Sequence, residues 1–182
     1  MKTHAILLTF CTVLTIGTLT GCSSTPTKSP EVSDTIRKSM DQGGLSDVTV
    51  SQDRDKGVVK LGGHVASETD KSTAESIAKS NAAGQVVANE IAVIPPGIES
   101  QAKTVNSDLD KGIDKNLDAA LVKSGLSKGV KYDVKNGVVT LKGEVDSQGK
   151  RSRIEAVASK VPNVQQVVNE LDVKGQKATS TN

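Results

Sequence analysis

Apolar residues recur along this chain at helical and then at strand spacing, and the whole order of elements is repeated. Val32, Ile36 and Met40 lie about one turn apart, which predicts a helix that begins at Ser29-Pro30. The runs that follow predict two strands, a helix and a third strand, at Val48–Val50, Val58–Val65, Ala74–Ala78 and Val86–Ile94.

The second half of the chain gives the same elements with clearer signals. Four apolar residues about one turn apart predict its first helix: Leu109, Ile113, Leu117 and Leu121. Strands at Val130–Val134 and Val138–Val145 meet across Asn136-Gly137, a dipeptide typical of tight hairpin turns. A last helix and a last strand complete the set, and Ser67 and Ser147 are the predicted N-caps of corresponding helices.

The repeat is visible residue by residue. The run Gly57-Val58-Val59-Lys60-Leu61-Gly62-Gly63-His64-Val65 returns as Gly137-Val138-Val139-Thr140-Leu141-Lys142-Gly143-Glu144-Val145, an offset of 137 − 57 = 80 residues. Upstream the offset slips by one, which we attribute to a one-residue difference in a loop. We therefore expect an α+β protein of two tandem αββαβ modules, each with a three-stranded mixed sheet packed on two helices.

The pattern also predicts boundaries. The two modules are expected at residues 30–95 and 107–175, flanked by segments that are too polar or too short to belong to either. These are a signal peptide, a polar tether, a linker and a disordered tail, at residues 1–21, 22–29, 96–106 and 176–182. The linker has two alternatives: it is flexible, or residues 101–106 extend the next helix backward.

Composition restricts what such modules bind. The chain has one Phe, one Tyr and no Trp, so its cores must be aliphatic, with Val59, Leu61 and Val65 on one face of their strand. Single-stranded nucleic acid is bound largely through aromatic stacking, and duplexes through strong positive charge, whereas the net charge here is +2. We therefore expect no nucleic-acid partner.

The first residues predict export. Lys2 precedes an apolar stretch from Ala5 to Leu19, which is too short for a stable membrane span and ends in small residues. The run Leu19-Thr20-Gly21-Cys22 resembles the bacterial lipobox, whose cysteine is acylated and becomes the first residue after cleavage. The resemblance implies a lipid anchor on Cys22. Ser23 at the next position resembles the outer-membrane sorting pattern of bacteria that have two membranes.

The modules themselves resemble a known family. The central-strand pattern Gly-Val-Val-x-Leu-x-Gly-x-Val and the last-strand pattern Val-x-Asn-Glu-Ile/Leu-x-Val, both present twice, are similar to those of the BON domain. The name refers to bacterial osmotically inducible and nodulation proteins. The resemblance implies interaction with phospholipid, outer-membrane integrity and a role in envelope or osmotic stress, with a chaperone role in some members.

Residues suited to catalysis are scarce. His64 is the only histidine after the predicted leader, and its counterpart Glu144 indicates an exposed strand position. One histidine and no free thiol do not make a nucleophilic triad or a histidine-rich metal site. We therefore expect no enzyme activity, cofactor or metal. Gly63 and Gly143 are expected to allow close packing or a bulge, and the repeated Asn-Glu pairs at 89–90 and 169–170 either to bind a ligand or to bond within the fold.

Charge gives one further lead. Residues 30–95 hold 7 Lys/Arg and 10 Asp/Glu, a net of −3, whereas residues 108–175 hold 12 and 10, a net of +2. Six basic residues of the second module are candidates for contact with anionic lipid: Lys123, Lys128, Lys131, Lys150, Arg151 and Arg153. The alternative is a solvated face of mixed charge.

These observations lead to one expected function and its rivals. We expect a non-enzymatic, lipid-anchored protein of the cell envelope, at the outer membrane and facing the periplasm, that binds phospholipid or a membrane surface and supports envelope integrity under stress. The alternatives are a periplasmic holdase-type chaperone, which would need an exposed apolar patch or an open sheet edge, and an adaptor for envelope proteins.

Overall fold

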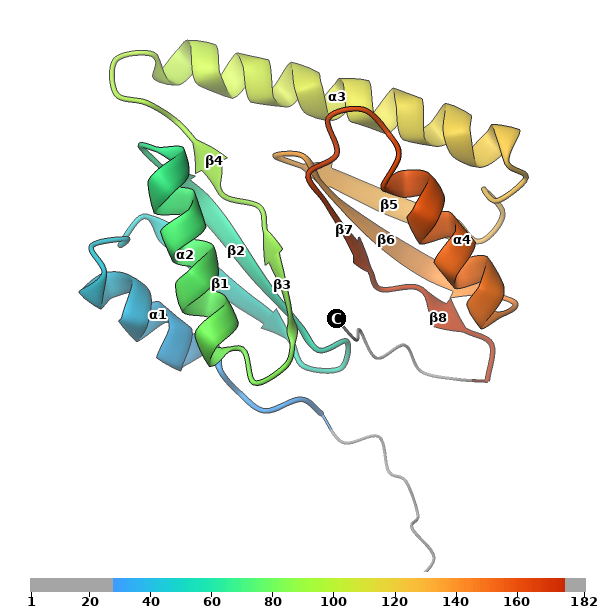
Figure 1. Cartoon of the computed structure of the whole chain (residues 1–182), viewed down its shortest axis with the longest axis horizontal. Coiled ribbons are helices and arrows are strands. Elements are labelled where there is room, and N and C mark those ends of the chain that lie inside the picture. The colour runs from blue at the N-terminus through green and yellow to red at the C-terminus, as the bar shows by residue number, and fades with distance from the viewer. Residues whose placement is uncertain (1–27, 176–182) are drawn as a thin grey trace, which may run out of the picture.

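The protein folds as two modules of the same αββαβ plan (Figure 1), and this computed structural model describes residues 28–175. Module 1 comprises α1 (Ser33–Gln42), β1 (Val48–Asp53), β2 (Val58–Val65), α2 (Glu68–Asn81), β3 (Val86–Asn89) and β4 (Ala92–Val93). Module 2 comprises α3 (Glu99–Lys123), β5 (Val130–Lys135), β6 (Val138–Val145), α4 (Gln148–Ala158), β7 (Gln166–Asn169) and β8 (Asp172–Val173).

Each module has a mixed sheet around one central strand. In module 1, β2 pairs antiparallel with β1 and parallel with β3 and β4, and β6 does the same with β5, β7 and β8. The α+β prediction is therefore confirmed. The predicted last strand of each module is in fact two short strands, because the chain leaves the ladder at Glu90 and at Glu170.

The helices cover one face of each sheet and enclose an aliphatic core. Val59, Leu61 and Val65 point into the first core and Val139, Leu141 and Val145 into the second, as the alternation predicts. Met40 and Leu121 fill equivalent places on α1 and α3, both almost fully buried. At about 25 cal/mol per Å² of apolar surface, this burial is the main favourable term in the stability of both modules.

Two of the predicted helix starts are correct and one is wrong. Ser67 Oγ accepts from Asp70 N at 3.1 Å, and Ser147 Oγ accepts from Lys150 N at 3.2 Å. By contrast, α1 begins at Ser33 rather than at Ser29-Pro30. The earlier residues are held extended, since Ser29 N donates to Arg54 O at 2.9 Å and Pro30 O accepts from Gln52 Nε2 at 2.7 Å.

Helix α3 is much longer than its counterpart α1. It runs for 25 residues, so residues 101–106 are helical, which is the second of the two alternatives for the linker. The helical spacing predicts that Leu109 shares the buried face of Ile113, but Leu109 is 45% exposed. The reason is that the first turns of α3 extend beyond module 2 and pass along the top of both modules (Figure 1).

The sheet faces that carry no helix pack against each other beside β3 and β7. A third buried cluster joins the modules there, formed by Val58, Ala88, Val138 and Val168. Gln166 completes this interface, because its side-chain amide accepts from Asn89 N at 3.1 Å and donates to Val87 O at 2.7 Å. The amide therefore occupies backbone groups of β3 that a further strand would otherwise use.

Candidate functional site

The repeated Asn-Glu pairs serve the fold and the interface. Asn89 donates to Glu75 Oε2 of α2 at 3.0 Å, and Asn169 donates to Glu155 Oε2 of α4 at 2.7 Å. The same side chains accept from the backbone two residues on, which fixes the bend where each last strand breaks. Of the two roles considered from the sequence, the structure supports bonding within the fold.

The glutamates of the same pairs reach across to the other module. Glu90 binds Lys135 at 3.3 Å, and Glu170 binds Lys60 at 3.1 Å. Both carboxylates are almost buried, with side-chain exposures of 10% and 7%. A buried carboxylate requires a partner, so these two pairs favour the observed arrangement of the modules over others.

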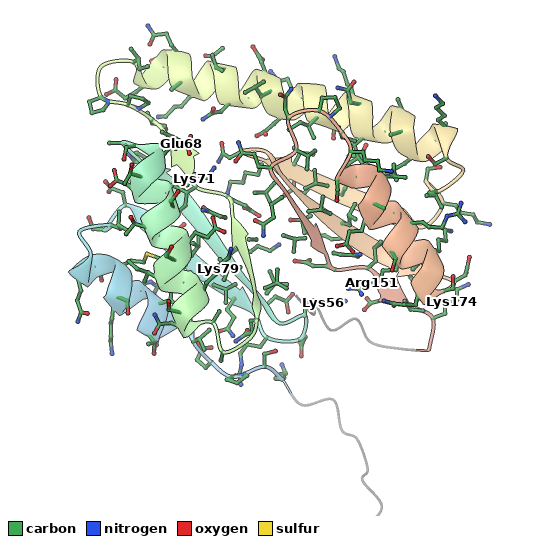
Figure 2. The ribbon with its side chains drawn as sticks, viewed as in Figure 1. Lys56, Glu68, Lys71, Lys79, Arg151 and Lys174 are labelled. Atoms are coloured by element: carbon green, nitrogen blue, oxygen red, sulfur yellow. The ribbon has the colours of Figure 1, made fainter. Side chains whose placement is uncertain are left out.

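Three lysines gather at the end of module 2 around one carboxylate. Asp146 lies 3.1 Å from Lys174 and 3.8 Å from Lys150, and Lys150 also donates to Lys128 O at 3.2 Å. The hydrogen bond from Lys174, followed by the charges of the three lysines, lowers the pKa of Asp146. We call Lys128, Lys150 and Lys174 the Asp146 cluster; Figure 2 labels Lys174 near the base of α4.

The other candidates from the sequence are dispersed. Arg151 is half-buried and donates to Asn169 O at 2.8 Å, so its guanidinium is engaged in the fold. Arg153 is exposed on α4, and Lys131 lies on β5, directly opposite Lys142 of β6. Cys22 lies outside the described residues. Sequence reasoning missed Lys174, whose position after the last strand gave no sign of the turn that brings it to Asp146.

Lys123 borders a separate cavity between the C-terminal ends of α3 and α4. The cavity measures about 490 Å³, and its walls are largely apolar: Ala120, Val157, Val161 and Pro162. Lys123, Lys160, Asn116 and Ser124 complete the lining. Val122, on the same last turn of α3, is 60% exposed. This site therefore places aliphatic surface next to two ammonium groups.

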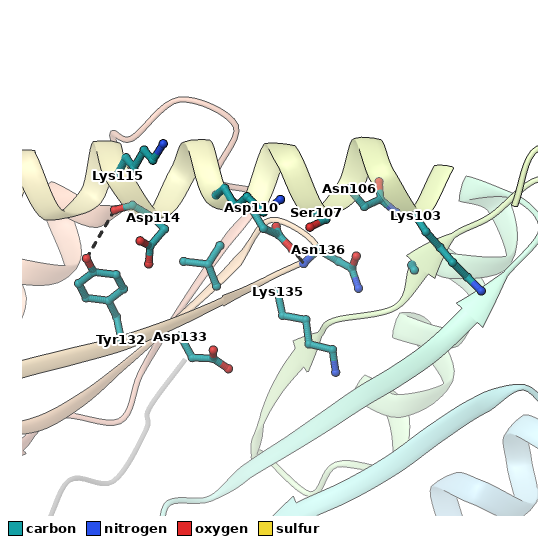
Figure 3. Close-up of a pocket in the computed structure, with 13 residues that line it drawn as sticks. Lys103, Asn106, Ser107, Asp110, Asp114, Lys115, Tyr132, Asp133, Lys135 and Asn136 are labelled. Carbon is teal, nitrogen blue, oxygen red and sulfur yellow. Dashed lines mark hydrogen bonds between the residues drawn. The ribbon is translucent and has the colours of Figure 1, made fainter. Parts of the chain in front are cut away.

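A larger cavity of about 550 Å³ follows the outer edge of β5 beneath α3 (Figure 3). Tyr132 points toward α3, and its hydroxyl lies 3.5 Å from Asp114 O. Burial, then the charges of Asp114 and Asp118, raise the pKa of this phenol. Asp110 accepts from Asn136 N at 2.8 Å and Gly137 N at 2.9 Å, so it is occupied with the hairpin turn.

Two further features are absent from residues 28–175. Across residues 28–175, no three of the His, Cys, Asp and Glu side chains are placed to hold a metal ion together. Within the same range, none of the helices is both long and apolar enough to cross a membrane.

Comparison with known proteins identifies the modules. The solved structures that resemble the chain include two of CdsD, a structural protein of the type III secretion system of Chlamydia trachomatis. One has 15% identity and a TM-score of 0.35, over 76% of this chain and 90% of that one. The other, its C-terminal domain, has 14% identity and a TM-score of 0.32, over 77% and 66%. No curated protein matches the chain. The family model of the BON domain matches twice, at residues 30–95 and 109–175, so the chain belongs to the BON domain family.

Proposed function

We propose that this protein is held at a membrane of the cell envelope by a lipid on Cys22 and binds phospholipid through module 2. BON domains are non-catalytic binding domains, generally associated with membranes, phospholipid and osmotic stress, and this chain has two of them. The role we propose is to support envelope integrity, at the outer membrane, under osmotic or envelope stress. The observation that carries the proposal is the cavity between α3 and α4.

A phospholipid combines an anionic head group with apolar chains, and the cavity offers a partner for each. Lys123 and Lys160 lie at its border, and each cation near an anionic surface contributes about 1 kcal/mol. Val157, Val161 and Ala120 supply the apolar wall. The only aromatic residue among the described ones, Tyr132, lies elsewhere, so binding here rests on charge and aliphatic contact.

Flotation of residues 23–182 with liposomes tests the proposal. We expect binding to vesicles with anionic phospholipid, loss of that binding at high salt, and little binding to purely zwitterionic vesicles. Replacing both Lys123 and Lys160 by glutamate should weaken binding by roughly 30-fold or more. Lys38→Glu on α1 is the matched control, since Lys38 is exposed and remote from the cavity. Equal flotation of all variants would contradict this site.

The exposed apolar residues favour a second candidate. Four large apolar side chains of the described chain are exposed, namely Ile98, Val105, Leu109 and Val122, and all lie on α3 or directly before it. Ile98, Val105 and Leu109 share one face of the helix, and a holdase needs such a surface for unfolded clients. Suppression of client aggregation that is lost in Val105→Ser together with Leu109→Ser, without flotation, would support this candidate instead.

A further inference from the structure

The outer strands β1 and β5 form the free edges of their sheets, and these two edges differ in how far other residues cover them. In module 1 the edge is covered: Arg37 donates to Val50 O at 2.9 Å, and the side chain of Gln52 bonds to Pro30 and Val32 at 2.7 and 3.1 Å. The bond from Arg37 occupies the outward carbonyl of Val50, which another strand would use, and the bonds of Gln52 hold residues 30–32 against the end of β1. Module 1 is therefore protected from edge-to-edge association.

In module 2 the corresponding edge is open. The counterpart of Arg37 is Asp118, which has no donor to offer a carbonyl group, and the counterpart of the extended segment before α1 lies within the straight helix α3. Among residues 28–175, none outside β6 is hydrogen-bonded to the backbone of Tyr132 or Val134. A six-residue strand with its edge uncovered is a template for another strand.

The alternation of the ladder identifies the groups on this edge. Glu144 N donates to Gly129 O at 3.2 Å, so residue 129 and each second residue after it direct their backbone groups toward β6. Tyr132 and Val134 therefore direct theirs outward. The same alternation in module 1 explains why the carbonyl of Val50, the counterpart of Tyr132, is available to Arg37.

The side chains on this edge are self-complementary. In an antiparallel pairing of two identical β5 strands centred on Tyr132, Lys131 of one copy lies opposite Asp133 of the other, and this occurs twice. Val130 then lies opposite Val134, and Tyr132 opposite itself. In such a register the Lys–Asp positions are the non-hydrogen-bonded ones, where side chains are closest.

The charged residues on β5 within one molecule also favour pairing with a second copy. Lys131 and Asp133 are both exposed and belong to none of the ion pairs of the described residues. Lys131 lies directly opposite Lys142, a like-charge arrangement that is unfavourable on a sheet. The carboxylate of Asp133 from a second copy would lie on the other side of Lys131 and offset that repulsion.

We propose that the partner of β5 is a second copy of this chain, which adds its own β5 edge to edge and antiparallel about Tyr132. The two C-terminal sheets then form one continuous sheet. In Figure 3 Asp133 and Lys135 point away from α3, so they lie on the face of that sheet that carries no helix. The α3 side chains that line the adjacent cavity include Lys111, Lys115 and Asp114, so a second copy does not meet a surface of one sign.

Photo-cross-linking of the full chain in cells tests this pairing. A photo-reactive phenylalanine analogue at Tyr132 should yield a product of twice the chain mass, whereas the analogue at Ser51, exposed on the covered edge β1, should not. Lys131→Asp alone and Asp133→Lys alone should each reduce the product at least about tenfold, because both ion pairs become like-charge pairs.

Two combinations then separate specific pairing from damage to the fold. The double variant carrying Lys131→Asp and Asp133→Lys should restore the product. Co-expression of the two single variants with different tags should give a product that contains both tags and not two of the same. Equal yields at Tyr132 and Ser51, no effect of charge reversal, or a product of Tyr132 with another protein alone would overturn the proposal.

Discussion

The two modules have separate cores that are built in the same way, and they differ at positions where a residue faces outward from its own module. Leu61 and Leu141, and likewise Asn89 and Asn169, occupy the same places and make the same kinds of contact. By contrast, Lys60 corresponds to the buried Thr140, Arg37 to Asp118, and Val86 to Gln166. Core positions hold apolar residues in both copies, whereas these three positions, which face the other module or a sheet edge, differ in polarity or charge.

This difference shows how two similar modules form an asymmetric pair. Their geometry is close to a two-fold arrangement, since the cluster that joins them contains equivalent residues of both modules, Val58 and Val138, and Ala88 and Val168. The hydrogen bonds across the interface are asymmetric, because Gln166 of module 2 bonds to the backbone of β3 while its counterpart in module 1, Val86, makes no equivalent bond. One edge strand of each sheet is thus used for the interface, and of the two outer edges within residues 28–175, that of β5 is the open one.

The glycine at the end of each central strand gives the largest expected effect. A Cβ on Gly143 would lie 2.2 Å from Gly129 O, and one on Gly63 would lie 2.0 Å from Asp47 O, and both have positive φ. Gly143→Ala should therefore lower the free energy of unfolding by about 3 kcal/mol or more, as measured by urea denaturation.

Gly44→Ala is the matched control for that prediction. Gly44 also has a positive φ, of 73°, but a Cβ there meets nothing within 4 Å. Gly44→Ala should lower the free energy of unfolding only by the cost of placing alanine in a left-handed backbone conformation, about 1 kcal/mol. Similar losses for Gly143→Ala and Gly44→Ala would show that the close approach of the two backbones is unimportant. The same comparison with Gly63→Ala tests whether the two modules behave alike.

The sequence alone predicts much of the fold. Helical spacing, strand alternation and Asn136-Gly137 are local signals, and the turn has the positive φ of both residues that such a dipeptide favours, 48° and 78°. The one-residue slip between the copies is correctly detected but has two causes. The hairpin turn is two residues shorter in module 2, and the loop from Leu126 to Val130 is one residue longer than that from Leu45 to Val48.

Contacts between modules could not be predicted in this way. Val58 and Val138 are apolar residues on strand faces that alternation assigns to solvent, and only the docking of the two sheets buries them. Of the candidate lipid residues, Lys123 lies at an apolar cavity, but Arg151 is turned into the fold by Asn169 O. A basic residue in a sequence does not reveal whether a carbonyl group or solvent faces it.

The asymmetric interface gives the next largest expected effect. Gln166→Ala removes two hydrogen bonds and leaves Val87 O and Asn89 N without that partner at a partly buried interface. We expect a loss of about 2 kcal/mol in the free energy of unfolding, again from urea denaturation. Gln166→Glu, which keeps the shape but loses the donor to Val87 O, should be comparably unfavourable. A loss below about 0.5 kcal/mol for both variants would mean that the amide does not hold the modules together.

The protected edge of module 1 gives a smaller effect. Arg37→Ala removes the donor to Val50 O, which should cost about 1 kcal/mol, because the Arg37 side chain is 53% exposed. Asp118→Ala, at the corresponding place in module 2, should change stability by less than about 0.5 kcal/mol. The shift in the midpoint of thermal unfolding, compared between Arg37→Ala and Asp118→Ala, measures this difference. Equal shifts would mean that Arg37 does not cover the β1 edge.

The smallest expected effect lies on α2, where the modules differ at one ion pair. Burial tends to raise the pKa of Glu75, but hydrogen bonds from Lys79 at 2.6 Å and Asn89 at 3.0 Å outweigh it and lower that pKa. A carboxyl group whose pKa is lower in the folded state adds stability at pH values above its pKa in the unfolded state. This stability is lost as the pH falls through the pKa of the folded state.

Lys79→Ser copies Ser159 of module 2. It should raise the pKa of Glu75 in a carboxyl NMR titration and weaken the dependence of stability on pH in that acidic range. Lys38→Ser, on the exposed face of α1, should leave the titration of Glu75 unchanged. If the pKa of Glu75 does not rise in Lys79→Ser, the bond from Asn89 alone is sufficient to hold its charge, and the modules do not differ here.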